Sequence, residues 1–543
     1  MRTQSKLFVA VLIFTCVPSV FGARIERMVD TWKPVHYQVN IKLDSQLTQI
    51  ESATTCVDIV AIKRLSMIDL DFGDLTIDTV SVDDRTVPFT HKSERIVINL
   101  AGPVNAGTKI SVAITYHGKP KDGLILGPDK DGKAAAVGDN WPNRVHHWIP
   151  SLDHPSAKAS VTFNITASAN NLVVANGSLD HVETTAEGNR TWTYTEEAPI
   201  PPYCMIIGAG QFNKSEPLHS SLTPLSIYVP GSDAIAAQKG FAPANPILQY
   251  FSQTVGAYPY EKLALIVGNT RFGGMENSGA IVFAAGLFTN ADQKPSPPYD
   301  IPNSTLNVVA HEIAHQWFGD SVTESTWSDL WLSEGFATYF AGLFFQRSQG
   351  EAAFQEYMKQ AAQVVFEYEQ KSNAPIFDRE TEDLFKLLNP NNYHKGAWVL
   401  HMLRSQLGDE SFFKGIKAYY DSHKNGNATS EDLRSALEKA SGKGLSNFFK
   451  RWIYESGHPV YKLSSQWNSQ QQKLTLKLEQ NQAGNAFLDP VPITVQSELG
   501  KVDFVLNPQG KLTTKTVALK AKPTAIIIDG NNTLLKEATT QLN

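Results

Sequence analysis

Cysteine is scarce in this sequence, with only three residues among 543. That number is far too small for a disulfide-stapled scaffold. Cys16 falls in the N-terminal segment, and Cys56 and Cys204 lie too far apart in the sequence to form a cysteine zinc motif. In an oxidising compartment these two residues can form one bridge, and the alternative is two separate buried thiols. The sequence leaves both possibilities open.

Long runs of one charge, internal repeats and low-complexity tracts are also absent. The chain has 48 Lys and Arg against 54 Asp and Glu, a formal net charge of -6. Without a basic run, the sequence does not indicate binding to nucleic acid. Hydrophobic residues make up 42% and charged residues 19%, which is typical of a folded globular protein. A chain this long exceeds one hydrophobic core, so we expect several domains.

Strongly apolar stretches are missing except near the N-terminus. Within residues 1–22, a basic start precedes a short apolar run that contains Pro18, and small residues lead up to Ala23. This pattern favours a cleaved signal peptide over a membrane anchor, which needs a longer run. We therefore expect an exported protein, secreted or periplasmic, with no stable membrane insertion after residues 1–22 are removed.

The hydrophobic pattern divides the rest of the chain into three parts. Residues 23–215 alternate apolar and polar side chains between turn residues, which predicts an antiparallel β domain. Segment 126–156, rich in Gly, Pro, Asp and Trp, predicts a long functional loop within it. Residues 216–455 show mainly helical spacing, and alternation returns over residues 456–543, which predicts a small β-sandwich. The expected fold class is therefore multidomain α+β.

The sharpest motif is His311-Glu312-Ile313-Ala314-His315. On a helix, positions i and i+4 share a face, so both imidazoles can reach one ion, and zinc is the metal that this pattern favours. Alone, the pattern also arises by chance among ordinary histidines. Glu334 follows after residues 316–333 as the candidate third ligand. We expect the first helix to end at Gly319 and Glu334 to lie about two turns along a second helix that runs back beside it.

Two carboxylates near this motif have other expected roles. Glu312 points away from the ligand face, so it is the candidate general base for a water held by the ion. Asp329 is a candidate acceptor for the second ring nitrogen of a ligand histidine. The alternative for Asp329 is an ordinary aspartate at a helix N-terminus. The sequence does not decide between these two.

Three motifs together identify a family. The GGMEN motif at 273–277, HEIAH at 311–315 with Glu334, and NNYHKGAWVL at 391–400 occur in this order and spacing. The chain resembles the gluzincin aminopeptidases, relatives of aminopeptidase N and of the leukotriene-hydrolysing aminopeptidase. The resemblance implies a saddle-like N-terminal β domain, a thermolysin-like mainly helical catalytic domain and a C-terminal β-sandwich. It also implies a short form without the large C-terminal helical domain.

The resemblance assigns roles to further residues. The exopeptidase motif of the family corresponds to Gly273, Gly274, Met275, Glu276 and Asn277, and its carboxylate, Glu276, would bind the free α-ammonium of a peptide. Glycines allow the backbone to approach an extended peptide and pair with it as an added strand does. Without the metal motif, the same stretch predicts only a turn.

Another segment supplies a candidate for the oxyanion. Tyr393 matches the family tyrosine whose hydroxyl stabilises the oxyanion, a role that suits a phenol donor. On its own, Tyr393 would be an ordinary packed residue at the start of a helix. His394 and His401 are interpreted as ordinary helix residues, and His146 and His147 receive no role.

The resemblance is incomplete at two places. Relatives usually carry a second amine-binding Glu or Gln at the position where this chain has Trp141. Asp139 and Asn140 are the candidates to replace it. Many relatives also have a Glu seven residues after the third ligand, where this chain has Ala341.

These features predict a zinc aminopeptidase with one ion per chain, which hydrolyses the first peptide bond of peptides that have a free N-terminus. Glu312 would activate the water, and Tyr393 would stabilise the oxyanion. The alternatives are a zinc endopeptidase with the same site and a catalytically silent peptide-binding relative. The sequence gives no preference for the first residue, no physiological substrate and no oligomeric state.

Overall fold

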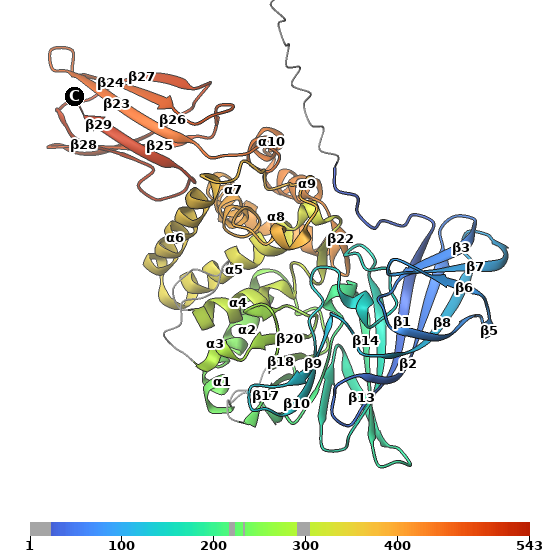
Figure 1. Ribbon diagram of the computed structural model, residues 1–543. Coiled ribbons are helices and arrows are strands. Elements are labelled where there is room, and N and C mark those ends of the chain that lie inside the picture. The colour runs from blue at the N-terminus through green and yellow to red at the C-terminus, as the bar shows by residue number, and fades with distance from the viewer. Residues whose placement is uncertain (1–22, 217–222, 232–233, 290–303, 543) are drawn as a thin grey trace, which may run out of the picture.

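The computed structural model describes residues 23–216, 223–231, 234–289 and 304–542 (Figure 1). The expected signal peptide lies outside the described residues. A strand-rich N-terminal part, a helical central part and a second strand-rich part follow one another along the chain, and the last projects from the far side of the helices (Figure 1). This is the expected multidomain α+β architecture. The expected domain boundaries near residues 215 and 455 stay predictions.

An eight-stranded sheet forms the body of the N-terminal part. Its strands, in spatial order, are β13 (Ser178–Thr184), β14 (Arg190–Ile200), β11 (Ala159–Ala167), β1 (Trp32–Leu43), β2 (Ile50–Ala61), β8 (Lys109–Gly118), β4 (Thr76–Val82) and β5 (Arg85–Thr86). Burial alternates along the central strands, for example in β11, because one face of the sheet packs on the core. The sheet is antiparallel as expected, except that β1 and β11 run parallel.

Two smaller sheets complete this part. One contains β3 (Leu65–Asp71), β7 (Arg95–Val104) and β6 (Phe89–His91), and the other contains β12 (Leu172–Ala175), β15 (Ile207–Gly210), β10 (Ala134–Gly138) and β9 (Leu124–Pro128). The prediction of a long loop over 126–156 is therefore wrong for its first part. Asp129 Oδ1 accepts from the backbone N–H groups of Asp131 and Lys133, which closes a hairpin turn between β9 and β10. The remaining segment contains a short 3₁₀ turn, Val145–His147, and an isolated bridge from Ser151 to Asp71.

A five-stranded sheet begins the central part. Its order is β16 (Asn213–Ser215), β17 (Leu225–Val229), β18 (Leu263–Gly268), β20 (Ala280–Ala284) and β19 (Gly274–Met275). The helices near this sheet are α1 (Ala234–Gly240), α2 (Ala244–Thr254), α3 (Gly286–Thr289) and α4 (Ser304–His315). Strand β19 lies at the end of the order, so one of its edges has no partner among the described strands.

Six further α-helices form the body of the central part. They are α5 (Trp331–Gln349), α6 (Glu351–Glu369), α7 (Gly396–Leu407), α8 (Asp409–His423), α9 (Ser430–Ser441) and α10 (Ser446–Trp452). Helix α5 is buried along its whole length from Trp331 to Phe345 and contacts α4, α6 and α7 (Figure 1). A helix that is apolar on every side must lie at the centre of a domain. Helix α5 is therefore the core element of this part.

Seven strands form the C-terminal part, in two facing sheets. One has the order β27 (Leu512–Ala518), β24 (Lys473–Gln480), β23 (Val460–Asn468) and β29 (Glu537–Leu542); the other has β26 (Gly500–Leu506), β25 (Val491–Ser497) and β28 (Pro523–Ile528). The sandwich is anchored to the helices by side chains, since the Trp452 indole donates to Asp489 at 3.0 Å.

Two expectations about the chain as a whole concern cysteine and the membrane. Cys56 and Cys204 are both free thiols, so the two are separate as in the second alternative, but Cys56 is only half-buried. Cys204 is buried and its Sγ lies 3.4 Å from Asp320 Oδ1. None of the helices in the described ranges combines the length and the apolar character that a membrane span requires.

Candidate metal centre

Helix α4 carries the first two candidate ligands. His311 and His315 lie one turn apart on the same face, and both side chains are buried. The helix ends at His315, four residues before the expected end at Gly319. The chain leaves the helix there because Gly319 takes a φ of +118°, while the N–H of Asp320 turns back to the carbonyl of His315 at 3.0 Å.

Helix α5 supplies the third candidate ligand. Glu334 lies in its first turn, so the expectation of about two turns along the helix is wrong. The reason is that residues 321–330 form the short strand β21 (Val322–Glu324) and a 3₁₀ turn, Trp327–Asp329, and the helix begins later than its apolar pattern indicated. Helices α4 and α5 pack side by side, as expected.

The three candidate ligand atoms converge on one point. Glu334 Oε2 lies 3.1 Å from His311 Nε2 and 3.3 Å from His315 Nε2, and the two Nε2 atoms are 3.0 Å apart. Two imidazole nitrogens and a carboxylate oxygen, all buried, form a donor set for a divalent cation. Burial by itself would raise the pKa of Glu334, but His315 and His311 outweigh it and lower this pKa. The residues present therefore fit a metal ion.

Neighbouring groups orient one of the ligands. His315 Nδ1 lies 3.1 Å from the carbonyl oxygen of Phe318 and 3.1 Å from Ser333 Oγ, which leaves Nε2 directed at the centre. Asp329 hydrogen-bonds to Ser430 and Thr326 rather than to a ligand histidine, and it lies in the 3₁₀ turn just before α5, which agrees with the alternative of an aspartate at a helix N-terminus. Its Oδ1 accepts from the backbone N–H and the hydroxyl of Ser430, so it holds the first turn of α9.

Glu312, the candidate base, is buried between the metal centre and the glycine motif. Its carboxylate, that of Glu276 and the His315 ring each offer an atom within 4.8 Å of the others. A Cβ built on Gly274 would lie 2.4 Å from the Glu312 carboxyl carbon. The structure thus brings the predicted base and the predicted amine-binding carboxylate close together beside His315.

The motif from Gly273 to Asn277 contains the edge strand β19. Gly274 pairs with Phe283 and Met275 with Val282, and among the described strands the other edge of β19 has no partner. An unpaired strand edge is where an extended peptide can add as a further strand. Glu276 is only 6% exposed. Burial, with the nearby Glu334 and against the effect of His315, raises its pKa to about 7. A cation bound beside it would relieve that cost.

Gln316, to which the sequence assigned no role, fixes this motif to α4. Its side-chain N–H₂ donates to the carbonyl of Glu276 and to Asp320 Oδ2, both at 2.8 Å, and its oxygen accepts from the N–H of Gly279 at 2.8 Å. Because Gln316 follows His315 directly, it holds the Glu276 backbone at a set distance from the candidate ligands. A polar residue inside the apolar run after the histidine was the only signal available.

Tyr393 lies in a π-helical turn, Asn391–Lys395, rather than at an ordinary helix start. Its ring stacks on His311, with ring centres 5.8 Å apart and planes at 7°. A Cβ on Gly335 would lie 2.9 Å from the Cα of Gly396, so bare backbone lets α5 and the start of α7 approach closely. This contact sets Tyr393 beside the centre, and π-helical turns often occur at functional sites.

One small cavity joins these groups, and Trp141 forms part of its wall. The lining residues are Trp141, Phe272, Gly274, Met275, Glu276, His315, Glu334, Leu388 and Tyr393. Asp139 accepts from Arg144 at 3.0 Å and from Thr270 at 3.1 Å. Asn140 donates to the carbonyl of Met205 and accepts from the Trp148 indole at 2.8 Å. Both candidates for the second amine-binding residue are thus engaged by other protein groups, and Trp141 lines the cavity.

Comparisons with known proteins agree with this geometry. Residues 33–204 match the Peptidase M1 N-terminal domain, and residues 242–452 match the Peptidase family M1 domain. Probable aminopeptidase 2 of Sulfurisphaera tokodaii is 30% identical over 467 residues, covering 81% of this chain and 56% of the relative. Tricorn protease-interacting factor F2 of Thermoplasma acidophilum is 26% identical over 464 residues, covering 81% and 57%.

A mammalian protein is similar to this chain to about the same degree. Glutamyl aminopeptidase of Bos taurus is 25% identical over 487 residues, covering 83% of this chain and 49% of the relative. The chain thus spans about half the length of the curated relatives it matches. The two family matches follow each other in the order of the β-rich and helical parts, and the second contains the candidate metal ligands. The chain therefore belongs to peptidase family M1, a gluzincin family that includes the relatives of aminopeptidase N.

Proposed function

We propose that this protein is a zinc-dependent aminopeptidase that removes the first residue from peptides with a free N-terminus. Membership of family M1 and the aminopeptidase names of its relatives support the reaction class. The observation that carries the exopeptidase assignment is the position of Glu276. This buried carboxylate follows an unpaired strand edge and shares one cavity with His315 and Glu334.

The proposed cofactor is one zinc ion per chain, held by His311, His315 and Glu334. Two neutral imidazoles and a carboxylate suit zinc and leave a position for water or substrate. When bound there, zinc supplies Lewis acidity, which polarises the scissile carbonyl and makes a water molecule more acidic. The 3.0–3.3 Å separations of the three donor atoms support this assignment.

Glu276 and the strand edge would bind the substrate. The free edge of β19 offers backbone groups to an extended peptide, and Glu276 accepts hydrogen bonds from its terminal ammonium. Because only the end of a chain carries this cation, the contact selects the first peptide bond. The hydrogen bonds of Gln316 to the Glu276 carbonyl and to the following turn keep the distance between Glu276 and the proposed metal ligands fixed.

Two side chains would move or share charge during the reaction. Glu312 takes a proton from the attacking water and delivers it to the leaving amine. Tyr393 donates its phenol hydrogen to the carbonyl oxygen as negative charge develops there. Both residues line or adjoin the cavity that contains Glu276.

A matched pair of substrates tests the proposal. The parent protein is expected to release the first residue from a short peptide with a free N-terminus and to leave the N-acetylated twin intact, whereas an endopeptidase would cleave both at an internal bond. Glu312→Gln is expected to abolish release while the protein keeps its metal. Peptide binding by the parent without any hydrolysis would instead support a silent binding protein and overturn the proposal.

We also propose that the protein is exported. The basic and apolar pattern of residues 1–22 is the support, since these residues lie outside the described structure. Expression with the natural N-terminus, followed by N-terminal sequencing of the protein outside the cytoplasm, is expected to give a chain that starts at Ala23. Retention of the full-length chain inside the cell would contradict this proposal.

A further inference from the structure

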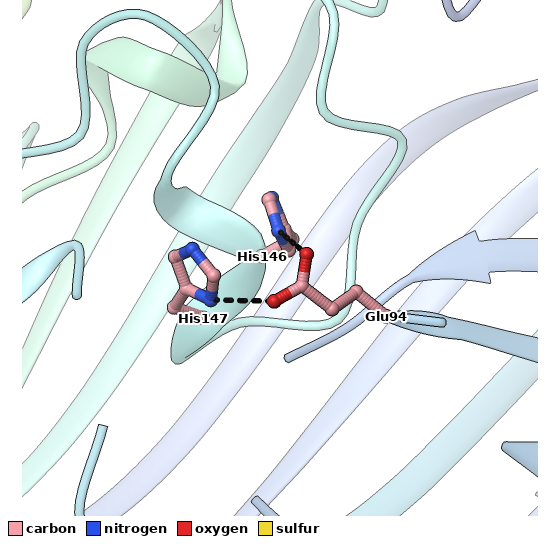
Figure 2. Close-up of side chains that lie close together, drawn as sticks. All are labelled: Glu94, His146 and His147. Atoms are coloured by element: carbon pink, nitrogen blue, oxygen red, sulfur yellow. Dashed lines mark ion pairs between the residues drawn. The ribbon is translucent and has the colours of Figure 1, made fainter. Parts of the chain in front are cut away.

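A cluster of two imidazoles and a carboxylate lies in the N-terminal part, on residues without a role in the proposed reaction. His146 and His147 occupy the short 3₁₀ turn Val145–His147, and Glu94 reaches them from the turn that joins β6 to β7 (Figure 2). Each of the three offers a ligand atom, and these atoms all lie within 4.8 Å of one another. In Figure 2 the carboxylate faces both rings.

The distances within this cluster fit an ion better than hydrogen bonds. Glu94 Oε2 lies 3.9 Å from His146 Nε2, and Glu94 Oε1 lies 3.9 Å from His147 Nδ1 (Figure 2). Both distances are too long for hydrogen bonds. Two bonds of zinc length to one ion separate their ligand atoms by about 3.4 Å at a tetrahedral angle and by about 4.2 Å in a line. Each observed separation lies between these values, and the two involve different oxygens of the Glu94 carboxylate.

His146 has the orientation of a metal ligand. Its Nδ1 lies 2.7 Å from Asp153 Oδ2, which also accepts the backbone N–H of His146 at 3.1 Å. A ring proton on Nδ1 would satisfy Asp153 and leave Nε2, 3.9 Å from Glu94 Oε2, as the atom that can face an ion. Against the effect of burial, the surrounding carboxylates raise the pKa of His146, so an ion at Nε2 would have to displace a proton. A carboxylate behind the ring is the usual arrangement that orients a ligand histidine.

His147 presents a nitrogen with no hydrogen bond. Its Nδ1 is buried and has no hydrogen-bond partner among the described residues, so the lone pair of this atom is available to an ion. A buried polar atom without a partner costs stability unless a ligand or water satisfies it. The adjoining carbonyl of His146 accepts from the N–H of Gly73 at 2.8 Å, which holds this turn against the end of β3.

Glu94 is held in place by an unfavourable backbone conformation. Ser93 and Glu94 have φ of +53° and +58°, the left-handed region that glycine and asparagine prefer. The carbonyl of Glu94 accepts from the N–H of Phe72 at 2.9 Å, which fixes the turn. Its side chain is 45% exposed, so an ion can enter from solvent.

We propose that Glu94, His146 and His147 form a second site for a divalent cation of the zinc type. Imidazole nitrogen with carboxylate oxygen is a donor set that favours this class over magnesium or calcium. The ion would join the β6–β7 turn to the loop that contains Val145. Trp141, four residues earlier in this loop, forms part of the wall of the proposed catalytic cavity. This site is independent of the proposed peptidase reaction.

Counting bound zinc in the full-length protein tests the proposal. Glu94→Asn removes the carboxylate and suits the left-handed backbone, so it is not expected to unfold the protein. Asp84→Asn is the matched control, because Asp84 also has a left-handed backbone, with a φ of +62°, in the exposed turn between β4 and β5. Among the described residues, Asp84 belongs to none of the candidate metal-ligating clusters. After equilibration with excess zinc and removal of free ion, metal analysis is expected to give two ions per chain for the parent and for Asp84→Asn, and one for Glu94→Asn and for His147→Gln.

A second comparison separates this site from the catalytic one. The double variant His311→Ala/His315→Ala is expected to keep one zinc ion, and adding Glu94→Asn to it is expected to leave none. Zinc is also expected to raise the melting temperature of the double variant and not of the triple variant. If the double variant binds no zinc, or if Glu94→Asn leaves the zinc count of the parent unchanged, the cluster is only an ion-pair network and the proposal is overturned.

Discussion

The carboxylate of Glu312 occupies the space in which a side chain at position 274 would lie. A Cβ on Gly274 would be 2.4 Å from both the carboxyl carbon and Oε1 of Glu312. Real Cβ atoms do not approach other atoms this closely, so one of the two residues would have to move. The position of the proposed general base therefore requires glycine at position 274 of the predicted exopeptidase motif, although the two residues belong to different elements, β19 and α4.

Gly274→Ala is therefore expected to lower kcat strongly, because the new methyl group displaces the proposed base from its position. A displacement of about 1 Å can cost a factor of about 100 in rate. The zinc content should stay unchanged, since the three atoms nearest to the new Cβ all belong to Glu312, which is not a proposed ligand. Steady-state kinetics with a free N-terminal peptide and metal analysis check this outcome. Gly102→Ala is the control, because a Cβ there meets nothing within 4 Å. Full activity of Gly274→Ala would show that Glu312 works from another position.

Removal of the metal should abolish activity reversibly. Dialysis against a chelator is expected to reduce peptide hydrolysis to background, and added zinc is expected to restore it, because His311, His315 and Glu334 form the proposed centre. His315→Ala should lose the ion and the activity together, since it removes a nitrogen 3.0 Å from that of His311. His117→Gln, a change at an exposed histidine, serves as the control. Chelator-resistant hydrolysis would exclude the proposed role of zinc.

Tyr393→Phe should separate binding from chemistry. Removal of one donor to a developing oxyanion typically costs a factor of about 100 to 1,000 in kcat. Because the aromatic ring stays stacked on His311, the variant should keep its fold, its metal and its KM. Tyr368→Phe, on α6, is the control. A variant with unchanged kcat would remove Tyr393 from the mechanism and leave the zinc centre intact.

Local patterns predicted the regular elements well. The alternation over residues 23–215 predicted a strand-rich part, because strands such as β8 and β11 bury one face. The spacing of the motif on α4 predicted that both histidines share a face, and the interval to Glu334 predicted a second helix that brings this carboxylate to them. These are properties of a few neighbouring residues or of a motif, and they do not depend on distant packing.

Features that depend on tertiary contacts were not predictable. Gly319 was a local signal for the end of α4, but the earlier end at His315 also depends on the bonds that Gln316 makes to a loop 40 residues away, which the local pattern does not encode. The place of Trp141 in the cavity wall depends on Arg144, which ties Asp139 into the loop. Strands β9 and β10 were also not predicted, because they lie in a segment whose composition is typical of loops and pair only in the folded structure.

Glu196 provides a test of the electrostatics away from the metal centre. It lies on β14 and is fully buried, and Ala198 donates its N–H to one carboxylate oxygen. Burial raises the pKa of this carboxyl to about 8; the nearby Glu261 adds to the shift and Lys262 opposes it. The ordinary value is 4.5. The folded protein therefore keeps a proton on Glu196 in a pH range where the unfolded chain has released it.

The sign of the pH effect follows from that difference. The stabilisation that the protonated carboxyl contributes is complete below pH 4.5 and is lost as the pH rises toward about 8. Glu196→Gln mimics the protonated form at every pH, so its melting temperature should rise relative to the parent as the pH increases from about 5 to 8, with a limiting slope of about 1.4 kcal/mol per pH unit for one group. Glu197→Gln changes the exposed neighbour on the same strand and should show no such trend. Because other buried groups also titrate in this range, the difference between variant and parent melts is the quantity to measure, and a constant difference from pH 5 to 8 would show that Glu196 is ionised in the folded protein.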